Sequence, residues 1–338
     1  MSPLVIPIFI AHQGCPHRCI FCDQHSITGT AADEERQVTP LSVKKTIADW
    51  LAHSQDRQNR QVQVAFYGGS FTGLPFAGQR ELLEAVKPFI EQGAVQKVRL
   101  STRPDYVNQE SAAFLKEYSV KIVELGVQSM DSEVLEASGR GHTVQQSEKA
   151  VRLLRRNNFT VGVQLMCGLP GDSTVKIINT AKRVVKLAPD FIRIYPALVI
   201  KGSGLARLYR EGLYKPMTLH KAVAQVSILK AIFERHHIKV VRMGLQPSEE
   251  LQKKVLDGPY HPAFGELVAA RRLFKQTRQL LAGQQAGQVK RISIAAADES
   301  AFRGPRNLSM KRLADLGLLN GVELVFDQKQ PRNSVTVN

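Results

Sequence analysis

The chain has 338 residues, 43% of them hydrophobic, which is enough to bury the core of one large domain, or of one large and one small domain. Its formal net charge at pH 7 is +16, and because a field of that sign attracts polyanions we expect a polyanionic partner, with RNA as the leading candidate. The longest mainly apolar runs, residues 4–11 and 159–166, fall far short of the ~20 residues that span a bilayer, so we expect a soluble, cytoplasmic protein that does not bind membranes.

Short apolar runs rich in β-branched residues alternate along the chain with segments of helical period. The runs lie at residues 4–11, 62–67, 98–101, 121–127, 161–167 and 191–195. Six such units predict an α/β fold, in which a parallel sheet curls into a partial (β/α)6 TIM-like barrel. Pro7 cannot donate a hydrogen bond to a neighbouring strand, which favours an open edge for the first strand.

Two of the intervening helices carry clear start signals. Thr143 and Gln146 have the spacing of a capping box, ahead of apolar residues that recur at helical period from Val144 to Leu154. A second helix, with an apolar face from Ile177 to Val185, is expected to begin at Asp172 or Ser173.

The sequence after residue 245 contains no motif that we can assign, so we divide the chain into a core barrel at 1–245 and a small α/β extension at 246–338. We expect a helix from Phe264 to about Leu281, a Gln-rich linker at 284–288 and a β-α-β unit at 289–326. His261 could meet a substrate, although a loop histidine beside prolines is more often a turn residue. The 304–307 turn is equally compatible with a structural role.

Residues suited to ligand binding follow several of the predicted strands. They are the cysteine loop after the first strand, Gly68-Gly69-Ser70 after the second, Thr102-Arg103-Pro104-Asp105 after the third, Gln128-Ser129 after the fourth and Gly168-Leu169-Pro170-Gly171 after the fifth. Ligand sites of parallel α/β folds form at the carboxyl ends of the strands. We therefore expect these segments to meet on one rim. The glycine pair matches neither a dinucleotide loop nor a nucleophile elbow, but its backbone can approach a ligand closely.

Cys15, Cys19 and Cys22 lie within eight residues of one another. Three thiolates at this spacing can hold three irons of a [4Fe–4S] cluster and leave the fourth iron open. A zinc site completed by His12, His17 or His25 remains an alternative, although no second ligand pair follows. Disulfides are disfavoured, since four cysteines in a chain of this length are typical of a reducing compartment. Cys167 is expected to be a buried residue at a strand end.

The Cys-x3-Cys-x2-Cys loop, the Gly68-Gly69 pair and the strand end Gly126-Val127-Gln128-Ser129 together resemble the radical S-adenosylmethionine (SAM) superfamily. The resemblance implies a [4Fe–4S] cluster whose open iron binds SAM. One electron then cleaves SAM to methionine and a 5′-deoxyadenosyl radical, which removes a hydrogen atom from the substrate. It also implies oxygen sensitivity and an electron donor such as flavodoxin or ferredoxin.

The resemblance also implies roles for individual residues. Cys15, Cys19 and Cys22 match the cluster ligands, and Phe21 matches the aromatic residue beside them. The residues implied to contact SAM are Gly68, Gly69, Ser70, Ser101, Gln128, Arg140 and Gln164. Ser101 and Gln164 depart from the pattern, because relatives often carry carboxylates at these positions. The sequence identifies no further catalytic residue.

Within the superfamily, residues 4 to 250 resemble the radical domain of the catalytic subunit of Elongator, which modifies wobble uridines in tRNA. The segments that carry this resemblance are 102–106, 126–129, 140–143 and 195–204. We expect no counterpart of that subunit's acetyltransferase domain in residues 1–338. The resemblance implies tRNA modification, and whether acetyl-coenzyme A is used stays open.

Two other functions remain open: a radical SAM enzyme acting on a porphyrin-like small molecule or a peptide, and a non-catalytic iron–sulfur or zinc protein that binds nucleic acid. Basic residues that would serve nucleic-acid binding fall in three groups. These are Arg152, Arg155 and Arg156; Lys176, Lys182, Arg183 and Lys186; and Arg271, Arg272, Lys275 and Arg278. Each group alone is also typical of the solvated face of a helix.

Overall fold

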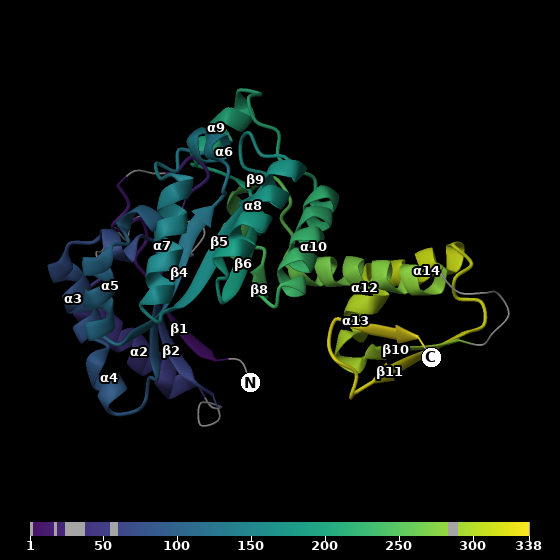
Figure 1. The fold of residues 1–338 in the computed structure, drawn as a ribbon, viewed down its shortest axis with the longest axis horizontal. Helices are drawn as coiled ribbons and strands as arrows, with labels where there is room; N and C mark the ends of the chain where they lie inside the picture. The colour runs from purple at the N-terminus through teal and green to yellow at the C-terminus, as the bar shows by residue number, and fades with distance from the viewer. Residues whose placement is uncertain (1–2, 17–18, 24–37, 55–59, 283–289, 338) are drawn as a thin grey trace.

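The computed structural model describes residues 3–16, 19–23, 38–54, 60–282 and 290–337 (Figure 1). His17, His25 and the Gln-rich linker lie outside these residues. Within the described part of the chain, no helix has both the length and the apolar character needed to cross a membrane.

A seven-stranded parallel sheet forms the centre of the structure and curls into a half-barrel. In spatial order the strands are β1 (Leu4–Phe9), β2 (Val62–Tyr67), β3 (Lys97–Thr102), β4 (Val120–Gln128), β5 (Thr160–Cys167), β6 (Phe191–Pro196) and β8 (Lys239–Met243). The six predicted strands are confirmed. The seventh, β8, was not predicted, because its short run is interrupted by Arg242 and lacks a clear alternating pattern.

The two outer strands of the sheet, β1 and β8, do not pair with each other, so the barrel stays open between them. Pro7 lies in β1, whose one partner strand among the described residues is β2, and the expectation of an edge strand is confirmed.

Helices follow the strands, and α7, α8 and α10 lie on the outer face of the sheet (Figure 1). The helices of this part are α2 (Pro40–His53), α3 (Phe76–Glu84), α4 (Lys87–Glu91), α5 (Gln109–Glu117), α6 (Ser132–Ala137), α7 (Val144–Arg156), α8 (Thr174–Leu187), α9 (Gly204–Arg210) and α10 (Leu219–Arg235). Thr143 and Gln146 form the predicted capping box, and Ser173 is the N-cap of α8.

The hydrophobic core lies between the sheet and the helices. Val98 and Leu100 of β3, for example, are fully buried there, together with Leu154 of α7. Because successive side chains of a strand point to opposite faces, the residues between them, such as Arg99 and Ser101, point into the barrel. The interior of the half-barrel can therefore be polar while the outer face of the same strands is apolar.

The C-terminal region is connected to the barrel in two ways. After α11 (Glu249–Lys254), β9 (Val255–Asp257) pairs antiparallel with β7 (Val199–Ile200). The long helix α12 (Phe264–Ala282) begins in the main core, where Phe264 and Val268 are buried. The predicted helix from Phe264 is confirmed.

Beyond α12, a small module lies to one side of the barrel (Figure 1). It contains β10 (Lys290–Ala295), α13 (Glu299–Arg303), α14 (Leu308–Asp315), β11 (Val322–Asp327) and β12 (Val335–Val337). β10 and β11 are parallel, which confirms the β-α-β unit, and β12 adds an antiparallel strand that was not predicted. The module has its own hydrophobic cluster, to which Leu273 and Leu281 of α12 contribute.

Candidate functional site

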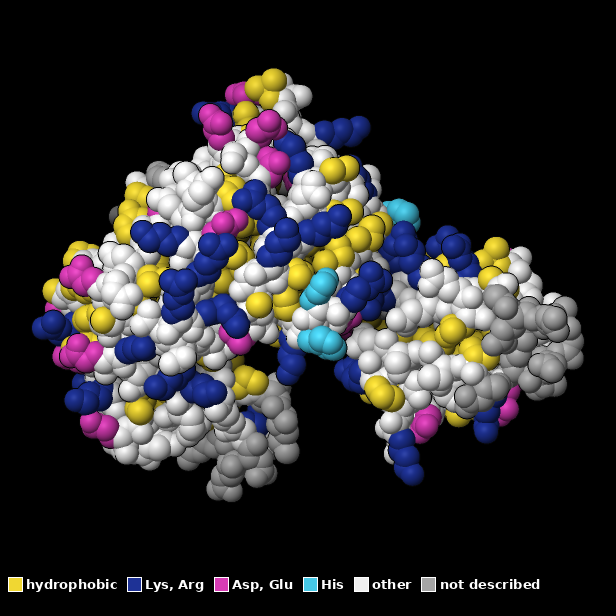
Figure 2. Space-filling view, viewed as in Figure 1, with side chains coloured by type: hydrophobic (Ala, Val, Ile, Leu, Met, Phe, Trp, Pro, Cys, Tyr) yellow, Lys and Arg dark blue, Asp and Glu magenta, His cyan; other side chains and the backbone are white. Residues whose placement is uncertain are grey.

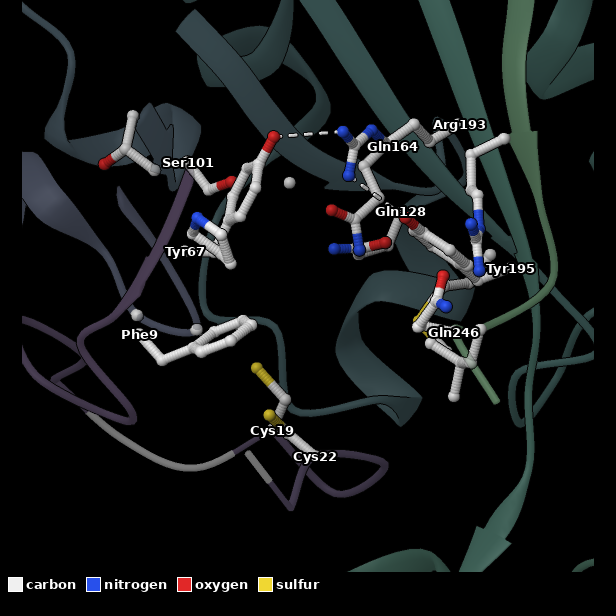
Figure 3. A pocket seen from close by; sticks show the side chains of 18 of the residues that line it. Phe9, Cys19, Cys22, Tyr67, Ser101, Gln128, Gln164, Arg193, Tyr195 and Gln246 are labelled. Atoms are coloured by element: carbon white, nitrogen blue, oxygen red, sulfur yellow. Dashed lines mark hydrogen bonds between the residues drawn. The ribbon is translucent and has the colours of Figure 1, made fainter. Parts of the chain in front are cut away.

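A cavity of about 1040 Å³ occupies the interior of the half-barrel (Figure 3). Each of the seven strands contributes to its lining, with Phe9, Tyr67, Ser101, Gln128, Gln164, Arg193 and Arg242 as one residue from each. All the site residues expected from the sequence line this cavity except Ser70. The expected convergence is found for the segments after the first four strands, whereas none of residues 168–171, after the fifth, lines the cavity.

The three cysteines of the loop after β1 line the same cavity. Cys19 is buried, whereas Cys15 and Cys22 are half-buried. The loop is held by backbone hydrogen bonds, from Cys22 N–H to the Cys19 carbonyl at 3.0 Å and from Leu205 N–H to the Ile20 carbonyl at 2.6 Å. Among the described residues, no three Cys, His, Asp or Glu side chains are gathered closely enough to hold a single metal ion.

Two arginines place positive charge beside the thiols. Arg140 Nη1 donates a hydrogen bond to Cys19 Sγ at 3.0 Å, and Arg103 Nη1 lies 4.0 Å from the same sulfur. Arg103 is held by both carboxylate oxygens of Asp105, at 3.0 and 2.9 Å. Burial raises the pKa of the Cys15 thiol, and the two guanidiniums act against that increase. The pKa of the Cys15 thiol stays above its ordinary value, but the two guanidiniums reduce the cost of placing a thiolate or another anion at this end of the cavity.

The Gly68-Gly69 turn packs directly on the cysteine loop. A Cβ atom at position 69 would lie 2.4 Å from the Ile10 carbonyl oxygen and 2.5 Å from that of Gln13, so no side chain fits there. Gly68 has a φ of +87°, in the region that favours glycine. Ser70 lies beneath the turn, where its hydroxyl is fully buried against Thr102 and accepts from Arg103 N–H at 3.3 Å.

Polar side chains of three neighbouring strands face the cavity beyond this turn. Ser101, Gln128 and Gln164 all line it (Figure 3). Gln128 has a φ of +65° and lies at an irregularity in the pairing of β4 with β5, which is an unfavourable backbone conformation for a residue other than glycine. Its Oε1 is buried and has no hydrogen-bond partner within the described residues. A ligand that donates a hydrogen bond would satisfy this atom.

The structure adds a charged network deeper in the barrel, which the sequence analysis did not identify. Glu124 Oε1 accepts hydrogen bonds from Arg99 and from the Tyr67 hydroxyl, and its Oε2 lies 2.8 Å from Arg193 Nε in an ion pair. Arg99 also donates to Gln63 Oε1 at 3.0 Å. The sequence does contain a signal for this network, because charged residues stand within otherwise apolar strands. Such residues are rarely buried unless they are paired.

Two residues considered from the sequence lie elsewhere. Cys167 is fully buried in the main core and does not line the cavity, and burial raises the pKa of its thiol. His261 Nδ1 accepts the backbone N–H of Ala263 at 3.1 Å, as a turn residue does. Both observations agree with the structural roles favoured from the sequence.

Lys and Arg side chains gather over the helices on the outer face of the sheet (Figure 2). Some of them are paired: Lys176 with Asp131 and Glu133, and Arg183 with Glu148. Arg156, Lys182 and Lys186 are exposed on α7 and α8. The outer face is therefore basic, although less so than a count of its lysines and arginines implies.

Comparison with known proteins gives two family matches. Residues 9–184 match the radical SAM superfamily, and residues 189–275 match the radical SAM C-terminal domain. The first match begins at the last residue of β1 and covers the cysteine loop, the glycine turn and β2 to β5, and the second begins just before β6.

Individual relatives cover varying parts of the chain. A tRNA uridine(34) acetyltransferase of Methanocaldococcus jannaschii is 25% identical over 299 residues, which are 78% of this chain and 54% of that protein. Protein YhcC of Escherichia coli is 29% identical over 210 residues, covering 59% of this chain and 64% of YhcC. The chain thus spans about half the length of the curated acetyltransferases that it matches.

Among solved structures, the archaeal Methanocaldococcus infernus Elp3 with an N-terminal deletion superposes with a TM-score of 0.62 and 22% sequence identity. The match covers 81% of this chain and 64% of that one. At this level of identity, the likeness shows a shared fold.

Proposed function

The chain belongs to the radical SAM superfamily, whose members bind a [4Fe–4S] cluster and SAM, and we propose that Cys15, Cys19 and Cys22 hold the cluster here. A bound, reduced cluster supplies the electron that splits the sulfonium of SAM into methionine and a 5′-deoxyadenosyl radical, which abstracts hydrogen from the substrate. The residues of the chain bind the cofactor, orient it and exclude water.

The chemistry of the cavity wall fits this pair of cofactors. Three thiols lie at one end, and thiolates are the ligands that iron–sulfur clusters use. Arg103 and Arg140 stabilise negative charge on those sulfurs. The unpaired Oε1 of Gln128 can accept a hydrogen bond from a ribose hydroxyl or an amine. No competing Asp or Glu lines the cavity among the described residues.

We assign the SAM contacts by position around the thiols. The Gly68-Gly69 turn offers backbone carbonyls to the methionyl amine, and Phe21 packs beside the cluster loop. Ser101, Gln128 and Gln164 face the adenosine. Arg140 suits the carboxylate because its guanidinium is a fixed fork of donors at the cluster end of the cavity, where its terminal nitrogens contact Cys19 Sγ and the Gly126 carbonyl. Ser70 acts through packing, because it supports the turn from below.

The observation that carries the proposal is the convergence of the three thiols and the glycine turn in one cavity. The test is to purify the protein without oxygen, reconstitute it with iron and sulfide, and add SAM and dithionite. We expect 5′-deoxyadenosine from the wild type and from Cys167→Ala, which removes a thiol that does not line the cavity. Cys19→Ala should abolish it. Equal product from Cys19→Ala, or none from the wild type, would refute the proposal.

We further propose that the substrate is tRNA and that the modified position is a wobble uridine. The relatives named as tRNA uridine(34) acetyltransferases, the net charge of +16 and the basic outer face support this. A tRNA substrate would place the reaction in the cytoplasm, with a flavodoxin or ferredoxin as electron donor. The barrel of residues 1–245 would hold the reaction, and we assign no role to the extension of residues 246–338.

The RNA proposal is tested by nucleoside analysis and by binding. Mass spectrometry of tRNA nucleosides from a deletion strain should show one modification lost, which identifies the product. Binding of tRNA should weaken steeply as salt increases, and Lys182→Glu with Lys186→Glu should weaken it further. Lys87→Glu, on α4, serves as the matched control. An unchanged nucleoside profile together with salt-independent binding would exclude tRNA as the substrate.

A further inference from the structure

We propose that the part of the cavity away from the cysteines is a subsite for an oxyanion of the substrate, a carboxylate or a phosphate, bound by Arg193 and Arg242. The inference rests on the proposed function, because it assigns the substrate a place in the cavity that holds the cofactors. It adds a ligand class and two residues that neither the sequence motifs nor the family assignment supplies.

Arg193 presents its guanidinium to the cavity from β6, the strand next to the outer strand β8 (Figure 3). It is the third residue of β6, in register with Gln164 of β5 and with Arg242 of β8. Its Nη2 donates to the Tyr67 hydroxyl at 3.0 Å, and its Nη1 lies 3.4 Å from the Tyr195 hydroxyl. The partners of its two terminal nitrogens are therefore tyrosine hydroxyls and not carboxylates.

The charges around Arg193 do not balance. Glu124 is buried between two guanidiniums, those of Arg99 and Arg193, so this group carries a net positive charge. Tyr67 does not supply the missing negative charge, because burial and the carboxylate of Glu124 raise the pKa of its hydroxyl. Arg242 adds another cation in the neighbouring strand position, where its Nε donates to the Gly244 carbonyl at 3.1 Å.

A purely structural role would not require this arrangement. Arg99 already makes two contacts with Glu124 Oε1, through Nε and Nη2, and one guanidinium is enough to neutralise one carboxylate. Of the five arginines among the described residues that line the cavity, Arg103 pairs with Asp105, and Arg99 and Arg193 share the single carboxylate of Glu124. Concentrating cations in a cavity is costly unless an anion joins them. An oxyanion between Arg193 and Arg242 would balance the group and use the forked donors of arginine.

The surrounding wall indicates what carries the anion. Aromatic rings of Phe9, Tyr67, Phe191 and Tyr195 line the same cavity. A ligand that pairs an oxyanion with a planar or apolar body would match both features. A nucleotide and a small aromatic carboxylate both have this chemistry.

Equilibrium dialysis of the anaerobically purified, cluster-loaded protein tests the subsite. One arm compares uridine monophosphate with uridine, and the other compares benzoate with benzyl alcohol. We expect one charged probe to bind more tightly than its neutral partner, and Arg193→Met to weaken that probe by roughly tenfold. Arg193→Lys should restore part of the loss. Arg210→Met, on the exposed surface of α9, is the matched control and should bind as the wild type does.

The results distinguish a phosphate ligand from a carboxylate ligand, and they test the subsite apart from the proposed function. Preference for uridine monophosphate assigns the subsite to a nucleotide phosphate, and preference for benzoate assigns it to a carboxylate. Equal binding of the charged and neutral probes overturns the inference. Unchanged binding of the charged probe in both Arg193→Met and Arg242→Met overturns it as well. Arg242→Met is included because Arg193→Met leaves Glu124 less well paired and could impair folding. Formation of 5′-deoxyadenosine needs no anion probe and dialysis needs no reductant, so the proposed function and this subsite fail separately.

Discussion

Arg140 and Cys19 lie 121 residues apart in the chain, yet Nη1 of the arginine donates a hydrogen bond to the sulfur of the cysteine at 3.0 Å. Arg103 supports the contact, because its Nη2 donates to the Arg140 carbonyl at 2.6 Å. A fixed cationic donor at a ligand sulfur stabilises the additional negative charge of a reduced cluster. The pair therefore links the loop after β1 to the redox chemistry proposed for the cavity.

Arg140→Met should lower the reduction potential of the bound cluster. Removing a positive charge near the sulfur favours the oxidised form, and we expect a shift on the order of 50 mV towards negative values. Redox titration followed by electron paramagnetic resonance, on protein with confirmed iron content and without SAM, measures it. Arg152→Met, exposed on α7, should leave the potential unchanged. A potential equal to that of the wild type would show that the contact has no redox role.

Gly69→Ala should destabilise the protein and reduce the amount of iron that it retains. The new Cβ would meet two backbone carbonyl oxygens at 2.4 and 2.5 Å, and backbone atoms of two loops cannot move apart without disturbing both. We expect a loss of about 1–3 kcal/mol in the free energy of unfolding, typical of overpacking. Denaturant unfolding and iron analysis provide the measurements.

Gly78→Ala is the matched control for this substitution. Gly78 lies in α3, and a Cβ there meets nothing within 4 Å, so we expect stabilisation by about 0.5–1 kcal/mol. If both alanine variants behaved alike, the contact between the two loops would not be tight in solution.

His142→Gln should make stability less dependent on pH below neutrality. Burial, followed by the charge of Arg140, lowers the pKa of His142 to about 3 in the folded protein, from an ordinary value of 6.5. Between these values the unfolded chain binds a proton that the folded chain does not. This residue therefore makes wild-type stability fall as pH decreases below 6.5, by at most about 1.4 kcal/mol per pH unit.

Denaturant unfolding at neutral pH and at about pH 5.5 tests this linkage, because the variant should lose about 1 kcal/mol less than the wild type over that interval. His53→Gln removes an exposed histidine at the end of α2 and should follow the wild-type curve. Identical pH dependence of His142→Gln and the wild type would mean that His142 titrates normally in the folded state.

Glu124→Gln should be strongly destabilising. The side chain is 2% exposed and lies between Arg99 and Arg193, so the substitution leaves two guanidiniums without their carboxylate. Breaking a buried pair in this way costs about 3–5 kcal/mol. The exposed Lys87–Glu91 pair is the comparison, and Glu91→Gln should change the free energy of unfolding by less than about 0.5 kcal/mol. Equal effects in the two variants would show that water reaches Glu124 in solution as it reaches Glu91.

Much of the fold could be read from local patterns. Alternation of apolar runs with helical periods located six strands, and the Thr143–Gln146 spacing located the start of α7, because capping and periodicity act over a few residues. Strand β8 was missed because it has no clear pattern over a few residues. Lys239–Met243 is short and partly exposed, and its identity as a strand depends on pairing with β6, which the local sequence does not encode.

The class of chemistry is evident from local features, the spacing of Cys15, Cys19 and Cys22 and the glycine turn. Which charges share the cavity depends on contacts between distant parts of the chain. Arg99, Glu124 and Arg193 lie on three different strands, and the Arg140–Cys19 contact joins residues 121 positions apart. Contacts of that kind depend on strand order and register, which arise from packing of the whole sheet and not from neighbouring residues.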